Sequence, residues 1–326
     1  MKITTITAIA MVAIAAAACT PHSNSADGSS GTKTIGIFNQ PSTFRAGNLT
    51  GKFVDLDIKT AVIDSGPAAL PLLKRGDLAA LTDVVGPAAL IAHGNDVASK
   101  IVWVTSDAIF KVVGGQNVRS AQDLVGKKIA VVPGSILEYA LISFLEKNGM
   151  SINQVQIVDL APESQPAALR TGQIDAAVAW EPAGTDMLAA GANELGSQRD
   201  PQFVMVSQAV IDDDPEFVQK FVCDYAASQT AMLKDPDAAY TAMQRDMHIP
   251  ADKLKLLLPV EFVLDPNAAL QQLSSTPEKL SPLGETLVAE GKYFADQGKI
   301  PAAPNPAEIP DLFETAFAEN VVAGKC

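Results

Sequence analysis

The sequence DLVGKKIAVVPGSILEYALISFLEKNGM, Asp123–Met150, contains the pattern from which the fold is predicted. Its run Lys128–Val132, rich in Val, Ile and Ala, has the composition of a buried strand. The turn Pro133-Gly134-Ser135 follows, and its serine is a residue type that caps helix N-termini. Apolar residues at three- and four-residue spacing then predict a helix over Ile136–Lys147, which Gly149 ends. A strand, a tight turn and a helix form the repeating unit of an α/β protein.

Strand-like and helix-like runs alternate on both sides of that stretch, from Thr34 to about Phe203. Gly, Pro, Asp and Ser bound the strand-like runs, and the alternation predicts a parallel α/β sheet. The expected strands are Thr34–Phe38, Leu56–Ile63, Leu78–Thr82, Lys100–Thr105, Lys128–Val132, Val155–Leu160, Asp175–Trp180 and Phe203–Ser207. The clearest expected helices between them are Pro67–Lys74, Gly86–Ala92, Ile136–Lys147 and Gln165–Thr171.

The character of the chain changes after Asp214, where Pro-marked turns separate expected helices. Two long strand-like stretches, Val102–Val113 and Phe203–Ile211, separate two βαβα-type runs and are expected to cross between two lobes. The expected helices of the later part are Glu216–Leu233, Pro236–Met247, Ala251–Leu257, Pro282–Gln297 and a short terminal one, Asp311–Asn320.

The composition is typical of a well-packed, acidic globular protein. Of the 326 residues 48% are hydrophobic and 19% are charged, and the formal net charge is −13. Nucleic acids and anionic lipid surfaces are bound by clustered Lys and Arg, so this balance argues against both as partners. No stretch after the N-terminal region is apolar for long enough to cross a bilayer.

The N-terminus has the pattern of an export signal. Lys2 precedes an uncharged, Ala- and Ile-rich run, and small residues end it before Cys19. This junction resembles the lipobox of bacterial lipoproteins, in which the cysteine is acylated. That pattern prefers Leu where this chain has Ala16, so a plain cleaved signal stays open. The Ser- and Gly-rich segment Thr20–Thr32 has the composition of a tether. We therefore expect residues 1–18 to be a signal peptide and residues 19–33 a lipidated tether.

Three cysteines and three histidines limit the metal and redox chemistry. If Cys19 is acylated, Cys223 and Cys326 remain, and in an oxidising compartment this even number predicts one disulfide. No histidine has metal-ligand spacing to a cysteine or to another histidine. We therefore expect no metal site and no cofactor.

Three junctions between a strand and a helix share small or polar residues: Ile63–Gly66, Thr82–Gly86 and Pro133–Ser135. In an open parallel sheet, ligands bind beyond the carboxyl ends of the strands, where free N–H groups at helix starts suit an anion. Taken singly, each junction is ordinary turn and cap chemistry. None is a phosphate-binding loop of the GxxxxGK[ST] type.

Taken together and in this order, three blocks resemble the taurine/sulfonate/nitrate solute-binding proteins of ABC importers, an NMT1/Thi5-like family. They are VIDSGPAALPLLKRGDLAAL (Val62–Leu81), the opening stretch Asp123–Met150, and VQIVDLAPESQPAALRTGQIDAAVAWEP (Val155–Pro182). The resemblance implies an α/β, type II periplasmic-binding-protein fold, with two lobes, two crossing strands and a ligand cleft between the lobes. The implied lobes are residues 34–112 with 208–326, and residues 113–207.

The resemblance also implies which loops line the cleft. Gln40 and Ser42 have a rival interpretation as a solvent-facing turn, Tyr139 and Trp180 as core aromatics, and Glu138 as a solvated charge. Trp180 precedes a polar Glu-Pro pair, which favours the cleft, whereas Trp103 is expected in the core. The implied ligand-binding residues are Asn39, Gln40, Ser42, Ser65, Gly66, Asp83, Val84, Gly86, Ser135, Glu138, Tyr139, Trp180 and Glu181.

The charges on these loops bear on the ligand. Asp83, Glu138 and Glu181 outnumber Arg45, the only base near the implied cleft. Buried carboxylates disfavour a bare inorganic anion, because like charges without partners are costly to bury. We therefore expect a small polar organic ligand that carries an amine, such as an amino-sulfonate or an amine-bearing heterocycle.

The expected function is ligand capture by a monomeric, membrane-anchored lipoprotein outside the cytoplasm, which feeds an importer permease and its cytoplasmic ATPase. One alternative is a small-molecule enzyme on the same fold, of the pyrimidine-synthase or lyase kind. No histidine lies on an implied cleft loop and no catalytic triad stands out, so we expect no enzyme. A ligand-sensing ectodomain is a third possibility, and fold alone does not decide among them.

Overall fold

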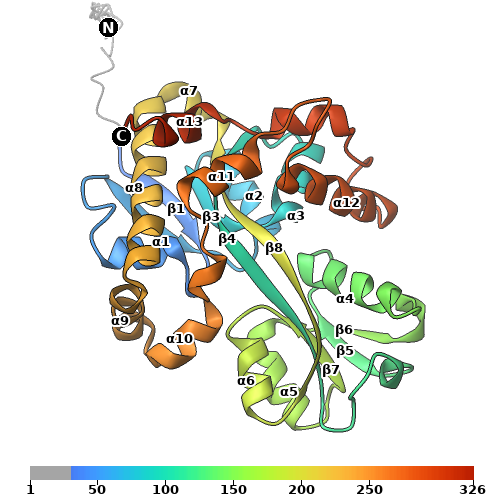
Figure 1. Cartoon of the computed structure of the whole chain (residues 1–326). Helices are drawn as coiled ribbons and strands as arrows, with labels where there is room; N and C mark the ends of the chain where they lie inside the picture. The colour runs from blue at the N-terminus through green and yellow to red at the C-terminus, as the bar shows by residue number, and fades with distance from the viewer. Residues whose placement is uncertain (1–30) are drawn as a thin grey trace, which may run out of the picture. The chain divides into compact units, whose positions relative to one another are not determined.

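The computed structural model describes residues 31–326, which form one unit from Thr32 onward. The expected signal peptide, the acylation of Cys19 and nearly all of the expected tether lie outside the described residues. A single sheet runs through the unit in the strand order β2-β1-β3-β8-β4-β7-β5-β6 (Figure 1). Its strands are β1 (Lys33–Ile37), β2 (Ile58–Val62), β3 (Ala80–Val84), β4 (Ser99–Gly114), β5 (Lys128–Val131), β6 (Gln156–Asp159), β7 (Ala176–Ala179) and β8 (Asn193–Ser207).

Helices cover both ends of this sheet; α8, α11 and α13 lie near β1, whereas α12 lies toward α4 (Figure 1). Among residues 31–326, no helix is both long enough and apolar enough to span a bilayer. The α-helices are α1 (Thr43–Leu49), α2 (Gly66–Arg75), α3 (Gly86–Gly94), α4 (Ile136–Lys147), α5 (Gln165–Arg170), α6 (Ala183–Ala189), α7 (Gln208–Asp213), α8 (Pro215–Lys234), α9 (Pro236–Met247), α10 (Ala251–Leu257), α11 (Pro266–Leu273), α12 (Pro282–Asp296) and α13 (Ala316–Val322).

The sheet is mixed rather than parallel throughout. β1 pairs in parallel with β2 and β3, and β5 pairs in parallel with β6 and β7. The two long strands run antiparallel to each other, and they also meet β3 and β7 in antiparallel fashion. The expected parallel pairing is therefore confirmed at the two ends and wrong in the middle, because β4 and β8 run in opposite directions between them.

The long strands β4 and β8 have 16 and 15 residues and run diagonally between the two ends of the sheet (Figure 1). The expected crossing stretch Val102–Val113 lies within β4. The second expected stretch, Phe203–Ile211, is wrong at both ends. Its helical end follows from Ser207, whose side chain accepts a hydrogen bond from the Val210 amide and so caps α7. Its strand starts ten residues earlier than expected, at Asn193, because β4 supplies backbone partners to a polar segment.

The described residues form four apolar cores, and the two largest lie toward opposite ends of the sheet. The larger surrounds the middle of β4, where Trp103 is 0% exposed and its Nε1 donates to Gln229 Oε1. The core position expected for Trp103 is thus confirmed. The smaller core packs α4 onto β5, with Leu137, Leu141 and Leu145 facing Ile129. Those leucines lie four residues apart, which explains why their pattern predicted α4 with the observed ends.

The helices α1, α6, α7 and α11 were not expected, since three of them are no longer than seven residues. The expected terminal helix Asp311–Asn320 is also wrong. A 3-10 helix ends at Leu312, and the Glu314 amide then donates to the Ile101 carbonyl of β4, so the chain is extended before α13. Pairing with β4 therefore keeps this segment extended, although its local sequence pattern favours a helix.

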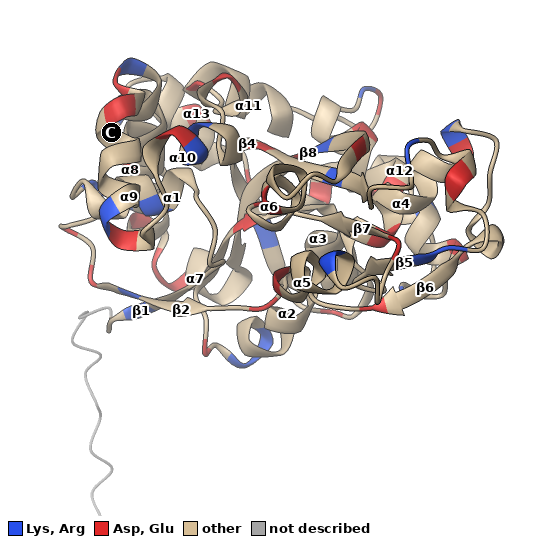
Figure 2. Ribbon diagram, turned by 90° about the horizontal axis from the view of Figure 1, so that it is seen from below, with Lys and Arg blue, Asp and Glu red and all other residues tan. Residues whose placement is uncertain are grey.

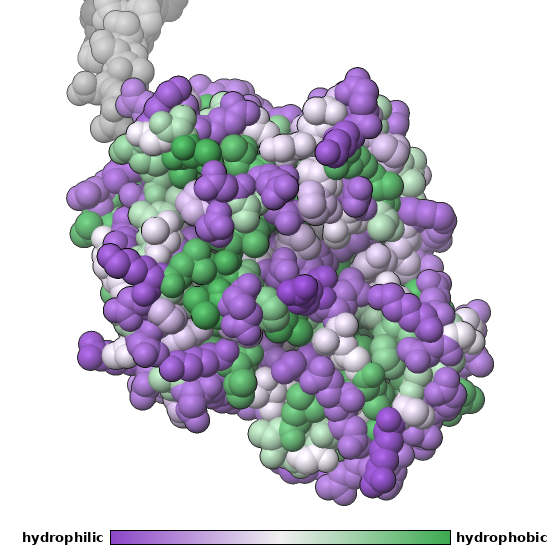
Figure 3. Space-filling model, viewed as in Figure 1, coloured by the Kyte–Doolittle hydropathy of each residue, from purple (hydrophilic) through white to green (hydrophobic). Residues whose placement is uncertain are grey.

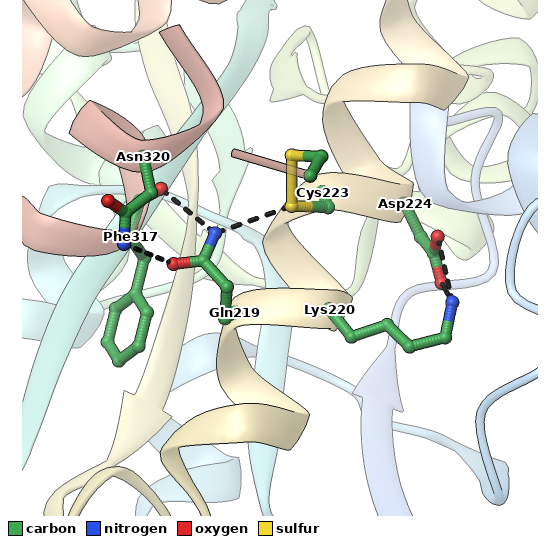
Figure 4. Close-up of a disulfide and its surroundings, with 7 residues drawn as sticks. Gln219, Lys220, Cys223, Asp224, Phe317 and Asn320 are labelled. Atoms are coloured by element: carbon green, nitrogen blue, oxygen red, sulfur yellow. Dashed lines mark hydrogen bonds and ion pairs between the residues drawn. A yellow bond between two sulfur atoms is a disulfide. The ribbon is translucent and has the colours of Figure 1, made fainter. Parts of the chain in front are cut away.

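A disulfide joins Cys223 of α8 to Cys326, the last residue, with 5.7 Å between the Cα atoms (Figure 4). One turn before Cys223 on α8, the side-chain nitrogen of Gln219 donates to Cys223 Sγ and to the Phe317 carbonyl. The side-chain oxygen of Gln219 accepts from Asn320. The disulfide closes a loop of 103 residues, and loops of that size stabilise by about 4–5 kcal/mol in the chain-entropy model. The C-terminal segment is thus fastened to α8.

Candidate functional site

A cleft lies where the loops after β1, β2 and β3 face the start of α4 and the end of β7. We call its two sides the first wall and the second wall, and the crossing strands between them the floor. The first wall contains Phe38, Gln40, Pro41, Ser65, Gly66, Pro67, Asp83, Val84, Val85, Pro87, Ala88, Leu257 and Leu258. The second wall contains Ser135, Ile136, Trp180 and Glu181, and the floor contains Asp107, Ala108, Ile109, Phe110 and Gln202.

The structure brings together many of the residues that the sequence implied for the cleft, but not all of them. Gln40, Ser65, Gly66, Asp83, Val84, Ser135, Trp180 and Glu181 line the cleft. Asn39, Ser42, Gly86, Glu138 and Tyr139 do not, and each has a local reason given below.

Helix starts face the cleft from both walls. Ser65 caps α2 by accepting from the Ala68 amide, and Ser135 caps α4 by accepting from the Leu137 amide. Val85, at the start of α3, makes no side-chain cap bond. Helix N-termini carry about half a positive charge, so both walls present a favourable potential to an anion.

Asp83 is the acidic group of the first wall. It lies within β3, at the register shift between Leu81 and Val84, with φ of 55°, and is 4% exposed. Its carboxylate accepts from Thr105 Oγ1 at 3.2 Å and from the Tyr225 hydroxyl at 3.3 Å, and Ser42 also faces it. Burial raises the pKa of Asp83 to about 6, although these neutral donors oppose the rise. Among the ion pairs of residues 31–326, none involves Asp83.

Glu181, in the second wall, has a different environment. Its carboxylate pairs with Lys111 Nζ at 2.8 Å and accepts from the Thr185 amide at 2.9 Å and from the Thr185 hydroxyl at 3.0 Å. Lys111 comes from β4, and its own side chain is largely buried. The charge of Glu181 is therefore neutralised within the wall. Beside it, Trp180 packs partly against the smaller core and partly lines the cleft.

Glu138 does not face the cleft, which corrects the expectation of three carboxylates there. Its oxygen accepts from the Gly134 amide at 2.7 Å, so the side chain folds back over the turn before its own helix. The neighbouring Tyr139 packs its ring against Tyr293 of α12, with 5.3 Å between ring centroids. Both side chains thus serve the contact between α4 and α12.

The remaining three implied residues are also placed by local contacts. Ser42 caps α1 by accepting from the Arg45 amide, and Asn39 accepts from the Arg45 guanidinium at 3.5 Å. At Gly86, an added Cβ would lie 1.6 Å from a carboxylate oxygen of Glu290, so this glycine faces Glu290 rather than the cleft. Arg45 pairs with Asp246 and does not line the cleft, so it supplies no charge to a ligand there.

Sequence reasoning missed Lys111, Asp107 and the apolar part of the cleft. A lysine within the apolar run Ile109–Val113 was a usable signal, because a charge is buried only with a partner. Asp107 and Gln202 lie on the floor as a consequence of β4 pairing with β8, which no local pattern shows. No group of three or more His, Cys, Asp or Glu within the described residues is arranged to hold a metal ion.

Comparisons with known proteins agree with this architecture. Residues 91–239 match the family model described as NMT1/THI5 like. The taurine-binding periplasmic protein of Escherichia coli K12 is 26% identical over 258 residues, which cover 74% of this chain and 78% of that protein. The alkanesulfonate-binding protein SsuA from Xanthomonas axonopodis pv. citri, solved with MOPS bound, superposes with a TM-score of 0.69 at 20% identity, covering 88% of this chain and 99% of that one.

A desulfurization enzyme, DszB, has the same fold, with a TM-score of 0.66 at 14% identity and coverage of 90% of this chain and 100% of that one. The fold thus occurs in named binding proteins and in an enzyme, although the sequence relatives are named as binding proteins. Residues 91–239 are therefore similar to the NMT1/THI5-like family, and the chain has the fold of the periplasmic binding proteins.

Proposed function

We propose that this chain is an extracytoplasmic solute-binding protein of an ABC importer, and that its cleft takes a small organic zwitterion of the amino-sulfonate type. One observation carries the choice of ligand: Asp83 is buried in the first wall among neutral donors, with no cation to neutralise it. An ammonium group is the natural partner for such a carboxylate.

The other half of the ligand is an anion. The N-termini of α2 and α4, capped by Ser65 and Ser135, approach the cleft from opposite walls and favour negative charge. Phe38, Phe110 and Trp180 supply apolar surface for the carbon skeleton between the two charged groups. The names of the relatives, taurine-binding and alkanesulfonate-binding, support this ligand class.

Closure of the two walls on the ligand is part of the proposal. The proposed lobes are residues 34–112 with 208–326, and residues 113–207. An ion pair between Lys253 of α10 and Asp186 of α6 joins them on one side. The ring contact of Tyr139 with Tyr293 joins them on another. A ligand held by both walls stabilises the closed arrangement, which the permease and its ATPase then recognise.

The location is proposed from the N-terminal sequence. A monomer anchored by an acylated Cys19 would hold the folded unit outside the cytoplasmic membrane, since more than one buried acyl chain gives stable anchoring. Mass spectrometry of the membrane-extracted N-terminus is expected to find the acylated cysteine. A free N-terminus would reject the anchor and leave export standing.

An enzyme on this fold is the second candidate, favoured by the likeness to DszB. Asp83, with its raised pKa, is the group that would act as a base. Both cysteines of the described part are joined in the disulfide, and the cleft lining contains no histidine. Incubation of the protein with taurine or ethanesulfonate, followed by product analysis, separates the candidates, because a binding protein returns its ligand unchanged.

A calorimetric and thermal-shift comparison of three probes tests the proposed ligand. Taurine carries both charges, ethanesulfonate only the anion and ethanolamine only the cation. Taurine is expected to bind tightest and to raise the melting temperature most, because a ligand of the native state stabilises it by mass action. Tighter binding of ethanesulfonate or nitrate than of any amine-bearing probe would reject the role of Asp83.

A further inference from the structure

Two buried carboxyl groups outside the cleft have no hydrogen-bond donor. Glu290 of α12 is 0% exposed and Asp200 of β8 is 1% exposed. No hydrogen-bond partner reaches any of their four oxygens. The two groups face each other closely enough that a proton on one would form a hydrogen bond to the other. An ionised carboxylate is only an acceptor, so a shared proton is the one way for this pair to satisfy itself.

The surroundings offer no neutralising charge. Asp107 of β4 faces Asp200, and Arg199, next in the chain, pairs with Asp107 at 3.6 Å. From α4, Tyr139 faces both carboxyl groups, and Glu146 lies near that tyrosine. On α12 itself, Tyr293 lies beside Glu138 and Glu146. Burial raises the pKa of both Asp200 and Glu290, and each is raised further by a neighbouring carboxyl group, Asp107 for Asp200 and Asp200 for Glu290.

The pair lies directly behind the first wall. Glu290 packs onto Gly86, the first residue of α3, so closely that only glycine leaves room for its carboxylate. The next residues on either side, Val85 and Pro87, line the cleft. Asp200 is in register with Ala108, a floor residue. The start of α3 therefore lies between the carboxyl pair and the cleft.

We propose that Asp200 and Glu290 form a proton-binding site that holds one proton between them at neutral pH, and that loss of this proton weakens the binding of an anionic head group in the cleft. The proposal rests on the proposed function. The shared proton turns two carboxylates into a hydrogen-bonded acid and carboxylate, with one negative charge less behind the wall.

The physical reason is the position of that charge. Glu290 lies against the start of α3, directly behind the cleft in which the anionic group is proposed to bind at the starts of α2 and α4. A second negative charge on the pair would repel that anion. By linkage, a ligand that binds better to the protonated form of the protein must raise the proton affinity of the Asp200–Glu290 pair by the same factor. Anion capture is then accompanied by uptake of solvent protons.

Titration calorimetry of the full folded protein with taurine, at about pH 6.5 and pH 8 and in buffers of different ionisation heat, tests this. That range brackets the raised pKa of about 7 for Asp200. The affinity of the wild type is expected to be on the order of tenfold higher at the lower pH, with net proton uptake on binding. Glu290→Gln removes the titration while keeping the shape, and is expected to bind taurine with little pH dependence. Glu285→Gln, an exposed position on the same helix, is the matched control and should behave like the wild type.

A second measurement does not depend on any ligand. Because the folded pair keeps a proton that the unfolded chain releases near pH 4, wild-type stability should fall as the pH rises from about 4 through the raised pKa values. This fall should be smaller in Glu290→Gln. Equal falls in the two proteins, or wild-type affinity that is constant between pH 6.5 and 8, would overturn the inference. Failure of every probe at every pH, with the stability difference intact, would instead reject the proposed function together with its link to the proton.

Discussion

The two walls of the cleft each bury one acidic residue, and the two residues differ in whether a cation neutralises them. In the second wall, Glu181 is paired with Lys111 and also accepts two bonds from Thr185. In the first wall, Asp83 accepts only from neutral hydroxyl groups, of Thr105 and Tyr225. A carboxylate paired with a cation is already neutralised within the protein, whereas the charge of one without a cation is available to a ligand. Position in the sequence does not separate these roles, because both acids lie at or just after the carboxyl end of a strand.

The distribution of charged residues along the chain does not show this difference. Figure 2 shows Lys and Arg interspersed with Asp and Glu over the helices and strands. Figure 3 shows hydrophobic residues gathered in patches among hydrophilic ones on one face of the molecule. The contrast is made by buried contacts, so substitutions in the walls are the way to test it.

Lys111→Met is expected to have the largest effect, on stability. It leaves Glu181 buried without its cation, and breaking a buried pair typically costs about 3–5 kcal/mol. Urea unfolding measures the loss. The double variant Lys111→Met with Glu181→Gln should recover part of it, since no unpaired charge then remains. An unchanged free energy of unfolding in the single variant would show that the two walls do not differ as described.

Asp83→Asn is expected to weaken taurine binding by about 2–3 kcal/mol, roughly 30- to 150-fold, because it removes the charged partner of the ammonium group. It should leave the protein at least as stable, since burial already disfavours the ionised form. Calorimetry with taurine measures the first effect and thermal unfolding the second. Equal loss of ethanesulfonate affinity would point to a general disturbance of the cleft.

Trp180→Ala is expected to weaken binding of any ligand that has a carbon skeleton, by about 1.5–2 kcal/mol, because an indole face is lost from the second wall. Trp103, the only other tryptophan, is buried in the larger core. Quenching of Trp180 fluorescence by the ligand, followed in the wild type, provides an independent readout. An affinity equal to that of the wild type would move the site away from the second wall.

The pH dependence of taurine binding should report the ionisation of Asp83. Since its pKa is raised to about 6, the carboxylate is protonated as the pH falls below that value and no longer attracts an ammonium group. In the Glu290→Gln background, in which the carboxyl pair no longer titrates, affinity should drop about tenfold from pH 7 to pH 5. Asp83 contributes to stability with the opposite sign: the folded state loses stability as the pH rises from about 4 to 6. Asp83→Asn in that background should flatten the affinity profile, and it should reduce the slope of the stability profile in this range.

Asp186→Asn is expected to have the smallest effect. It breaks the ion pair of α6 with Lys253, which joins the sides of the cleft away from the ligand. Both side chains are partly exposed, and such pairs contribute about 0.2–1 kcal/mol. Affinity for taurine should fall only a few-fold, and the fall should shrink in high salt. Asp237→Asn, which breaks an exposed pair with Lys255, is the control and should change nothing.

Local patterns predicted those parts of the fold that local contacts build. The run from Lys128 to Lys147 contains its own strand, cap and amphipathic helix, and the structure reproduces the helix ends that its spacing predicted. Helices α9 and α10 also begin and end as predicted, because prolines mark their starts. The positions of Ser65, Ser135 and Trp180 around one cleft followed from the family resemblance, since it aligned loops that the sheet brings to one edge.

Only the tertiary structure decided the rest, because it depends on contacts between distant residues. Pairing with β4 extended β8 back to Asn193 and unwound the expected terminal helix at Phe313. Lys111 and Glu181 are 70 positions apart, and so no spacing rule could show that one acid is neutralised while Asp83 is not. Asp200 and Glu290 meet across 90 positions for the same reason. The sequence by itself determined which segments become strands and helices, and the packing of those segments determined which charges remain available to a ligand or a proton.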